Sequence, residues 1–295
     1  MEYEQMEAFL MVAKTKSFSR SAELLNVVQS TVTVRIQQLE RKLGKKLFIR
    51  KTRSVELTDH GKILLPYIER VMELIKEGEQ ATISYGRYSE RLTIGGLYSV
   101  WNSAFYSIIQ KYRQKYPQVA IRLMTNHSDE INLKIKDGLF DAGLVCIPPM
   151  DPAFETVPLY QETLELVKSP SLSLEKTMVS SKDLLSLPYI HLDWGPPFTE
   201  WFIQEVGQQE LMGFSVDDAG TLLRALQLGE GIGFVLHQTV LEQIQNGTLE
   251  RVPFYSNQPI PKRTIFLVYP KRKQHHPALQ QWISYLLEEI KIFAY

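Results

Sequence analysis

The stretch QSTVTVRIQQLERKLGKKLFIRKTRSVELTDHG, residues 29–61, decides the fold of the first part of the chain. Its first half has apolar residues at steps of four, three and four, which places them on one face of a helix over residues 28–43. Gly44 then favours the left-handed conformation that ends a helix. The second half has two short apolar-rich segments, 47–49 and 55–57, on either side of a basic turn, and we expect them to form a two-stranded wing. The apolar helix residues are Val32, Ile36, Leu39 and Leu43.

Two further helices are expected before this stretch. Apolar residues at helical spacing predict an amphipathic helix over residues 4–14. Ser19 is a suitable N-cap for a short helix over residues 20–25, and a brief turn at 26–27 separates that helix from the next. Three helices with a tight turn between the second and the third indicate a helix-turn-helix, which the wing extends to a winged helix-turn-helix.

The exposed face of the helix at 28–43 has side chains of the kind that read DNA. In this motif the N-terminal end of that helix points into the major groove, where glutamine can read adenine and arginine can read guanine. A basic residue at the tip of a wing is placed to enter the minor groove. The candidate DNA-binding residues are Gln29, Ser30, Thr31, Thr33, Arg35 and, on the wing, Arg53. Taken alone, each would more often be an ordinary polar surface residue.

Basic residues are concentrated in this part of a chain whose net charge is zero. Residues 1–60 contain 11 lysines and arginines against 7 acidic residues, and residues 35–53 contain eight basic residues opposed only by Glu40. A basic module on a neutral protein is typical of nucleic-acid binding, although a solvated helix face gives the same pattern.

The remaining composition is that of an ordinary globular protein, with 44% hydrophobic and 22% charged residues. No run approaches the roughly 20 apolar residues that span a bilayer, and the acidic N-terminus does not resemble a secretory signal. The single cysteine, Cys146, cannot form an internal disulfide, and no Cys/His spacing suggests a zinc site. We therefore expect a cytoplasmic protein with no membrane contact, no metal and no cofactor.

Beyond these separate signals, the first 61 residues resemble the N-terminal domain of LysR-type bacterial transcriptional regulators. The resemblance implies binding to double-stranded promoter DNA, a small-molecule effector and a homo-oligomer, either dimer or tetramer, with RNA polymerase as a further candidate partner. The chain departs from the family at Val34, where many members carry a polar or basic residue. The residues that carry the resemblance are Phe9, Ala13, Ser17, Phe18, Ala22, Leu24, Gln29, Ser30, Val32, Thr33, Ile36, Leu39, Glu40, Leu43, Gly44, Leu47, Phe48, Arg50 and Leu57 through Gly61.

A long connecting helix is expected next. Thr58 can cap a helix that starts at Asp59 and continues toward Ser84, roughly 40 Å at 1.5 Å per residue. Its apolar residues recur at steps of four, three and four, as in a coiled-coil seam, and Pro66 predicts a local kink. The family resemblance implies pairing of this helix in a dimer; packing on the following domain is the alternative. The seam residues are Leu64, Ile68, Val71 and Ile75, and residues 86–90 are the expected hinge.

Residues 89–295 alternate between predicted strands and helices, which indicates a parallel sheet with helices on both faces. Two α/β halves joined by crossing strands at 165–168 and 264–269 resemble the periplasmic-binding-protein fold of the family's sensor domain. The expected fold class is α/β overall: an all-α winged helix-turn-helix with a long linker helix, then a two-lobed periplasmic-binding-protein-like domain. The expected domains are 1–58 for DNA binding, 59–88 for dimerisation and hinge, and 89–295 for effector binding, with lobe I at 89–163 and 267–295 and lobe II at 164–266. A helix over 102–115 is expected in lobe I.

Ligands of such sheets bind at the carboxyl ends of the strands, in the crevice between the lobes. Trp101, Trp194 and Phe198 would give that crevice an aromatic lining, although Trp194 and His191 are equally consistent with core positions. No arginine or lysine falls in the loops that follow the strands, which disfavours a strongly anionic effector. The candidate effector-binding residues are Tyr98, Ser99, Val100, Trp101, Asn126, Ser128, Cys146, His191, Trp194 and Phe198.

Enzyme functions find little support in the sequence. The glycines of residues 229–233 lie between a predicted helix and a strand, whereas a dinucleotide fingerprint lies between a strand and a helix. Cys146 adjoins the expected crevice and is either a redox switch or, more commonly for such a residue, an inert buried thiol. The chain is therefore expected not to be an enzyme; the alternative is a small-molecule carrier or enzyme with a helical N-terminal appendage.

Overall fold

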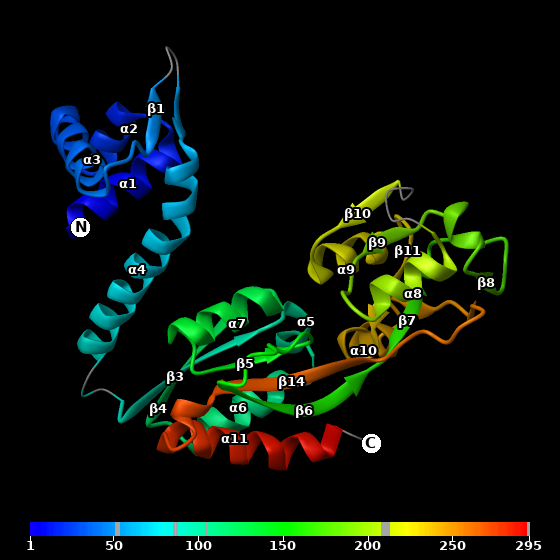
Figure 1. Cartoon of the computed structure of the whole chain (residues 1–295). Helices are drawn as coiled ribbons and strands as arrows, with labels where there is room; N and C mark the ends of the chain where they lie inside the picture. Colours follow the sequence, from blue (N-terminus) through cyan, green and yellow to red (C-terminus); the bar gives the residue numbers. More distant parts are fainter. Residues whose placement is uncertain (51–53, 85, 87, 104, 208–212, 294–295) are drawn as a thin grey trace. The chain divides into compact units, whose positions relative to one another are not determined.

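The computed structural model describes residues 1–50, 54–84, 86, 88–103, 105–207 and 213–293. The chain divides into two compact units, Met1–Arg87 and Tyr88–Tyr295 (Figure 1).

The first unit begins with three helices and a short hairpin, as the sequence predicts. They are α1 (Tyr3–Thr15), α2 (Phe18–Leu24), α3 (Gln29–Leu43), β1 (Phe48–Arg50) and the antiparallel partner of β1, β2 (Val55–Leu57). Gly44 ends α3 with a φ of 65°, which confirms its expected role. The predicted cap of α2 was wrong by two residues, because the hydroxyl of Ser17, not Ser19, accepts the backbone N–H of Arg20 at 3.2 Å.

The core of this unit is formed by buried residues of α1, α2, α3 and the wing, among them Phe9, Val32, Ile36 and Leu39. Leu43 was expected on the same buried face and is 40% exposed instead. The reason is that the core ends one turn earlier, at Leu39 and the buried Glu40.

A single long helix, α4 (Asp59–Ser84), completes the unit and runs through Pro66 without interruption. The hydroxyl of Thr58 accepts the backbone N–H of Gly61 at 3.0 Å, so the predicted cap is confirmed. The predicted seam of α4 is corrected: Ile68 is fully buried, and Leu64 and Ile75 pack beside it on the core of this same unit. Four of the apolar side chains that α4 leaves exposed form a neighbouring stripe, which we call the α4 stripe. Its members are Ile63, Tyr67, Val71 and Leu74.

The larger sheet of the second unit is mixed rather than wholly parallel, which corrects the prediction. Its strand order is β4-β3-β5-β14-β6, and β3 is parallel to β4 and β5, whereas β14 is antiparallel to both β5 and β6. β14 runs in the opposite direction because it returns from the second lobe. The strands are β3 (Glu90–Gly96), β4 (Val119–Thr125), β5 (Ala142–Val145), β6 (Phe154–Glu162) and β14 (Arg263–Pro270).

Helices cover both faces of this sheet (Figure 1). α6 (Phe105–Lys115) and α11 (Pro277–Glu289) pack together on one face, and α7 (Ser128–Asp137) lies on the other. The helix expected over 102–115 begins at Phe105 instead, and residues 98–101 before it form a separate helical turn, α5 (Tyr98–Trp101). The short 3-10 turns η3 (Lys271–Lys273) and η4 (Ile290–Phe293) flank α11.

The second lobe is built around β7, which pairs antiparallel with both β11 and β12. Two parallel pairs, β9 with β10 and β8 with β13, extend it. The strands are β7 (Leu164–Lys168), β8 (Val179–Ser180), β9 (Ile190–Leu192), β10 (Phe214–Val216), β11 (Ile232–Leu236), β12 (Glu250–Arg251) and β13 (Phe254–Tyr255). The helices are η1 (Asp183–Leu185), α8 (Phe198–Glu205), α9 (Ala219–Gln227) and α10 (His237–Gln245).

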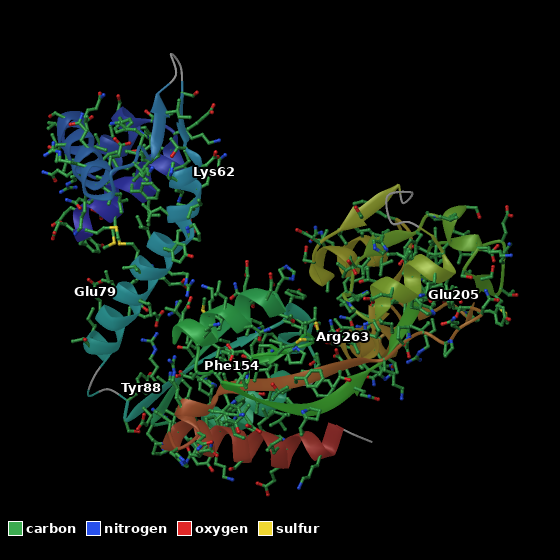
Figure 2. All side chains as sticks on the ribbon, in the orientation of Figure 1. Lys62, Glu79, Tyr88, Phe154, Glu205 and Arg263 are labelled. Atoms are coloured by element: carbon green, nitrogen blue, oxygen red, sulfur yellow. The ribbon has the colours of Figure 1, made fainter. Side chains whose placement is uncertain are left out.

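Two adjacent strands connect the lobes. β6 leaves the first sheet at Glu162 and the chain continues into β7, while β14 returns beside it. Arg263 pairs in register with Glu162, so β14 belongs to the first sheet from residue 263 onward rather than from 267. Figure 2 shows Arg263 at this junction. The two lobes therefore meet at a narrow two-stranded connection.

Candidate functional site

The N-terminal half of α3 presents the predicted DNA-reading residues at the surface of the first unit. Gln29 and Ser30 are exposed, and Thr31, Thr33 and Arg35 are half-buried. Arg53, the predicted wing residue, lies outside the described residues.

The same face of α3 includes residues that the candidate set omitted. Val34 is 48% exposed, and the adjacent Gln37 and Gln38 are exposed as well. Helical spacing could have identified them, because positions 30, 34, 37 and 38 lie opposite the buried stripe. An exposed valine at this place suits contact with a thymine methyl group.

Glu40 joins α3 to the wing. Its carboxylate is almost fully buried and accepts the backbone N–H groups of Leu47, at 2.9 Å, and Phe48, at 3.4 Å. The second carboxylate oxygen of Glu40 lies 2.6 Å from the Nζ of Lys46. One acidic side chain in a basic segment thus fixes the start of the wing on the reading helix.

Replacing Glu40 by alanine is expected to destabilise the first unit by about 1.5–3 kcal/mol, since hydrogen bonds to a buried charged group are lost. Unfolding of the full chain in urea, followed by circular dichroism, measures this loss. Lys46→Met is the control: the Lys46 side chain is 76% exposed, so we expect a loss below about 1 kcal/mol. Equal losses in the two variants would contradict the assigned role of Glu40.

A cavity of about 630 Å³ lies between the two lobes of the second unit. Its lining segments follow the carboxyl ends of parallel strands: residues 97–99 after β3, 125–130 after β4, 146–147 after β5, 192–195 after β9 and 217–219 after β10. This is the expected position of a ligand site in such sheets. The predicted residues that line the cavity are Tyr98, Ser99, Asn126, Ser128, Cys146 and Trp194.

Four predicted residues do not line the cavity. Val100 is fully buried in the first lobe. The indole of Trp101 packs over Gly96, where a Cβ atom would lie 2.2 Å from the ring. In the second lobe, the His191 ring packs against Phe202 with centroids 4.6 Å apart and planes tilted by 48°, and Phe198 is buried among other aromatic rings.

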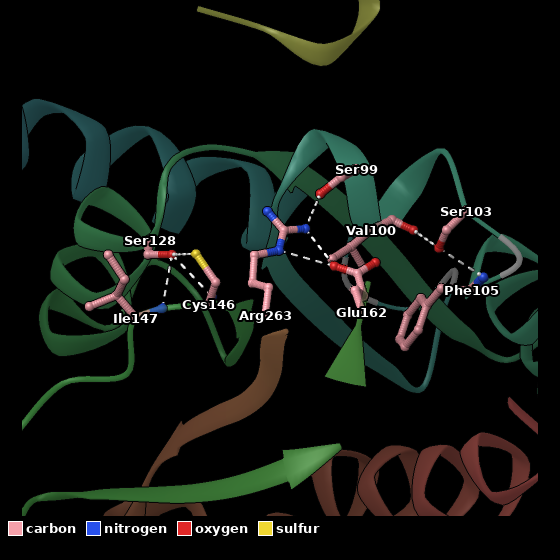
Figure 3. A network of polar contacts seen from close by, with 9 residues as sticks. All are labelled: Ser99, Val100, Ser103, Phe105, Ser128, Cys146, Ile147, Glu162 and Arg263. Atoms are coloured by element: carbon pink, nitrogen blue, oxygen red, sulfur yellow. Dashed lines mark hydrogen bonds and ion pairs between the residues drawn. The ribbon is translucent and has the colours of Figure 1, made fainter. Parts of the chain in front are cut away.

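Ser128 organises one side of the cavity (Figure 3). Its hydroxyl accepts the backbone N–H of Cys146 at 3.2 Å and that of Ile147 at 3.4 Å. The Sγ of Cys146 lies 3.4 Å from the same hydroxyl. The loop after β5 is therefore fixed to the first residue of α7.

Sequence reasoning missed the charged group at the base of the cavity. The guanidinium of Arg263 donates from Nε, at 3.1 Å, and Nη2, at 2.6 Å, to one carboxylate oxygen of Glu162. Nη2 also donates to the Ser99 hydroxyl at 2.8 Å (Figure 3). The guanidinium carbon lies 5.5 Å from the centroid of the Trp194 ring, on the second lobe.

The loops that follow the strands contain no arginine or lysine, as the sequence shows, but Arg263 reaches the cavity from outside these loops. The prediction considered only loops at the carboxyl ends of strands. β14 is antiparallel to β5, so the first residue of β14 lies at the same sheet edge as the last residues of β5.

Carboxylates line the cavity from both lobes. Asp218 caps α9, and hydrogen bonds from the hydroxyl and backbone N–H of Thr221 hold the pKa of its carboxyl below the ordinary value. Asp193 accepts hydrogen bonds from the Gly195 N–H and the Thr199 hydroxyl. The lining carboxylates are Asp129, Glu130, Asp193, Asp217 and Asp218.

Within the part of the chain that the structure describes, no group of three or more His, Cys, Asp or Glu side chains could hold a metal ion. None of the described helices is both long and apolar enough to cross a membrane.

Comparisons with known proteins agree for both units. Residues 86–291 match the family described as "LysR substrate binding domain", and residues 3–62 match "Bacterial regulatory helix-turn-helix protein, lysR family". The HTH-type transcriptional regulator CitR of Bacillus subtilis is 27% identical over 263 residues, which cover 88% of this chain and 90% of CitR. YofA of Bacillus velezensis, another HTH-type transcriptional regulator, is 30% identical over 238 residues, 80% of this chain and 81% of YofA.

Solved structures confirm the predicted fold class. The crystal structure of CbnR, a LysR family transcriptional regulator, matches with a TM-score of 0.73 at 21% identity, over 97% of this chain and 98% of CbnR. Full-length CbnR complexed with its target DNA also matches with a TM-score of 0.73, at 21% identity over 98% of this chain and all of that one. At this level of identity the likeness shows the fold alone.

Proposed function

The chain belongs to the LysR family of bacterial regulatory proteins, and from this premise we propose how it reads DNA, assembles and senses its effector. It is a DNA-binding transcriptional regulator with an effector-binding domain. We assign promoter reading to residues 1–58, dimerisation to 59–88 and effector binding to 89–295. The proposed working form is a cytoplasmic homodimer or a pair of homodimers, with RNA polymerase as a further partner at the promoter.

The DNA-reading proposal rests on the exposed surface of the N-terminal half of α3. Ser30 and Val34 are exposed on it, opposite the residues packed in the core, and Thr33 is half-buried beside them. Together they offer hydroxyl groups and an apolar contact, the kinds of group that distinguish base edges in the major groove. Basic residues on and after α3 would supply phosphate contacts, which position the protein without reading sequence.

The effector proposal rests on the cavity between the lobes. A ligand there would contact both lobes at their two-stranded connection. It shifts the regulator only if it binds one arrangement of the oligomer more tightly than the other. We propose Tyr98, Ser99, Asn126, Ser128, Cys146 and Trp194, together with Arg263, as the ligand-contacting residues.

Fluorescence anisotropy over a salt series tests the DNA-binding function, using the DNA upstream of the protein's own gene and a scrambled duplex. A sequence-specific regulator is expected to prefer the native duplex by at least about a thousandfold. Equal and steeply salt-dependent binding to both duplexes would leave only the nonspecific phosphate contribution for that fragment.

Variants of α3 test which residues read bases in the same assay. Thr33→Ala and Arg35→Ala are each expected to weaken the specific complex by about 1–3 kcal/mol and to affect scrambled DNA less. Arg113→Ala is the matched control, because Arg113 is an exposed arginine of α6 in the second unit. Equal losses of affinity for the native and the scrambled duplex would show that α3 contacts only the DNA backbone.

A further inference from the structure

The charge of the cavity between the lobes is unbalanced. Five carboxylates line it, two from α7 of the first lobe and three from the second lobe. Among the described residues, none of the five forms an ion pair with a basic side chain. The described lining contains one arginine and no lysine. Because Glu162 already neutralises that arginine, the cavity attracts a cationic group and repels a simple anion.

Arg263 adds a second and independent feature, a hydrogen-bond donor at the base. The residue is only 5% exposed, and its Nε and Nη2 atoms are bonded to Glu162 and Ser99. Its remaining nitrogen, Nη1, forms no hydrogen bond with a described residue. Figure 3 shows Nη1 pointing away from Glu162 and Ser99, on the side where Ser128 and Cys146 lie. Nη1 is therefore the guanidinium nitrogen that can donate a charge-assisted hydrogen bond to an oxygen acceptor on a ligand.

The N-terminus of α7 supports the same reading. This helix of ten residues begins at Ser128, which lines the cavity and is 5% exposed. The N-terminal end of a helix favours a negatively charged oxygen group. Because Asp129 and Glu130 of the first turn already interact favourably with this helix end, Arg263 is the main group that would bind a ligand carboxylate. The base of the cavity therefore suits a carboxylate, while the carboxylates around it suit an ammonium group.

We propose that the effector is a small zwitterion of the α-amino acid class, with its carboxylate at Arg263 and Ser128 and its ammonium group among the acidic side chains. This inference rests on the proposed effector function of the cavity. Leu97, Leu192 and Trp194 supply apolar walls, so an apolar amino-acid side chain fits best. A carboxylic acid without the amine meets uncompensated negative charge, and an amine without the carboxylate leaves Nη1 of Arg263 without an acceptor.

Isothermal titration calorimetry of the full chain with the twenty standard L-α-amino acids tests the proposal. Each amino acid that binds is compared with its analogue lacking the amine and its analogue lacking the carboxylate. For L-leucine these are 4-methylpentanoate and 3-methylbutylamine; for L-phenylalanine they are 3-phenylpropanoate and 2-phenylethylamine. We expect at least one amino acid to bind, and both of its analogues to bind at least about tenfold more weakly, roughly 1.4 kcal/mol.

Three substitutions test where the two charged groups of the amino acid bind. Asp217 is exposed and makes no hydrogen bond with a described residue, so Asp217→Asn should leave the fold intact. It is expected to weaken binding of the amino acid about threefold, the effect of one exposed ion pair. Glu175→Gln removes an exposed carboxylate of the second lobe outside the cavity and should change nothing. Arg263→Lys keeps the positive charge opposite Glu162. It should weaken the binding of the amino acid and the binding of its amine-free analogue by the same factor.

The proposal is overturned if no amino acid binds, if the amine-free analogue binds as tightly as the amino acid, or if Asp217→Asn behaves like Glu175→Gln. None of these results bears on promoter binding, which the anisotropy titration measures without any of these compounds. The two titrations therefore distinguish an incorrect ligand class from an incorrect regulatory function.

Discussion

Replacing Arg263 by methionine, with Glu162 left in place, is expected to lower the free energy of unfolding of the second unit by about 3–5 kcal/mol. The Glu162 side chain is fully buried and that of Arg263 is 7% exposed, so the substitution leaves a carboxylate without its counter-charge in the interior. The Ser99 hydroxyl also loses its donor. Urea unfolding followed by tryptophan fluorescence measures the loss specifically, because all four tryptophans lie in the second unit.

The double variant Glu162→Leu/Arg263→Met tests whether the buried charge is the cause. Removing both charges is expected to recover most of the stability, since replacing a buried ion pair by apolar residues is often neutral or stabilising. Arg113→Met, at an exposed position of α6, should cost less than about 0.5 kcal/mol. If the single and double variants were equally unstable, lost packing rather than an unpaired charge would explain the effect.

The ion pair between Glu162 and Arg263 could not be predicted from the sequence. Glu162 and Arg263 are 101 positions apart, and periodicity within a window of a few turns does not connect them. The first unit was more predictable because its signals are local. The spacing of apolar residues in α3, the cap at Gly44 and the cap at Thr58 each act within a few residues.

The cavity was predictable in position but only partly in composition. The rule that ligands bind at strand ends selected the correct loops, because it depends on chain direction alone. It does not say which side chain of a loop points into the crevice. Trp101 turns back over Gly96, a strand glycine that leaves room for the indole, and His191 and Phe198 complete the aromatic core of the second lobe. The glycine was a usable signal for Trp101; nothing local distinguished His191.

The connecting helix shows a similar limit. Steps of four and three residues fit two adjacent stripes on α4 equally well. The stripe that was predicted as the seam packs, through Leu64, Ile68 and Ile75, into the core of the first unit. The α4 stripe beside it stays exposed along Ile63, Tyr67 and Leu74, which are 66%, 60% and 41% exposed. Apolar side chains repeated along one exposed face of a helix are typical of a helix–helix interface. We therefore place the proposed dimer contact on the α4 stripe, which shares only Val71 with the seam predicted from the sequence.

The double variant Tyr67→Asp/Leu74→Asp places two aspartates on this stripe and is expected to convert the proposed dimer to a monomer. We expect a dimer to contact the promoter with two copies of the first unit and a monomer with one, so the affinity for the promoter should fall by about 100-fold to 10,000-fold, the usual gain from linking two binding modules. Because neither side chain belongs to the core, the fold should be unchanged by circular dichroism. Sedimentation equilibrium gives the oligomeric state, and anisotropy on the promoter duplex gives the affinity.

The control places two aspartates on a different face of α4, as Lys76→Asp and Ile83→Asp, and it lowers the net charge by one unit more than the stripe variant does. Both residues are exposed and lie away from the stripe, so this variant should stay dimeric. It should retain promoter affinity within about threefold, as expected for surface substitutions outside an interface. If the stripe variant remained dimeric, the dimer interface would lie outside the α4 stripe. One that became monomeric yet bound the promoter as tightly as the parent would show that a single first unit accounts for all of the recognition.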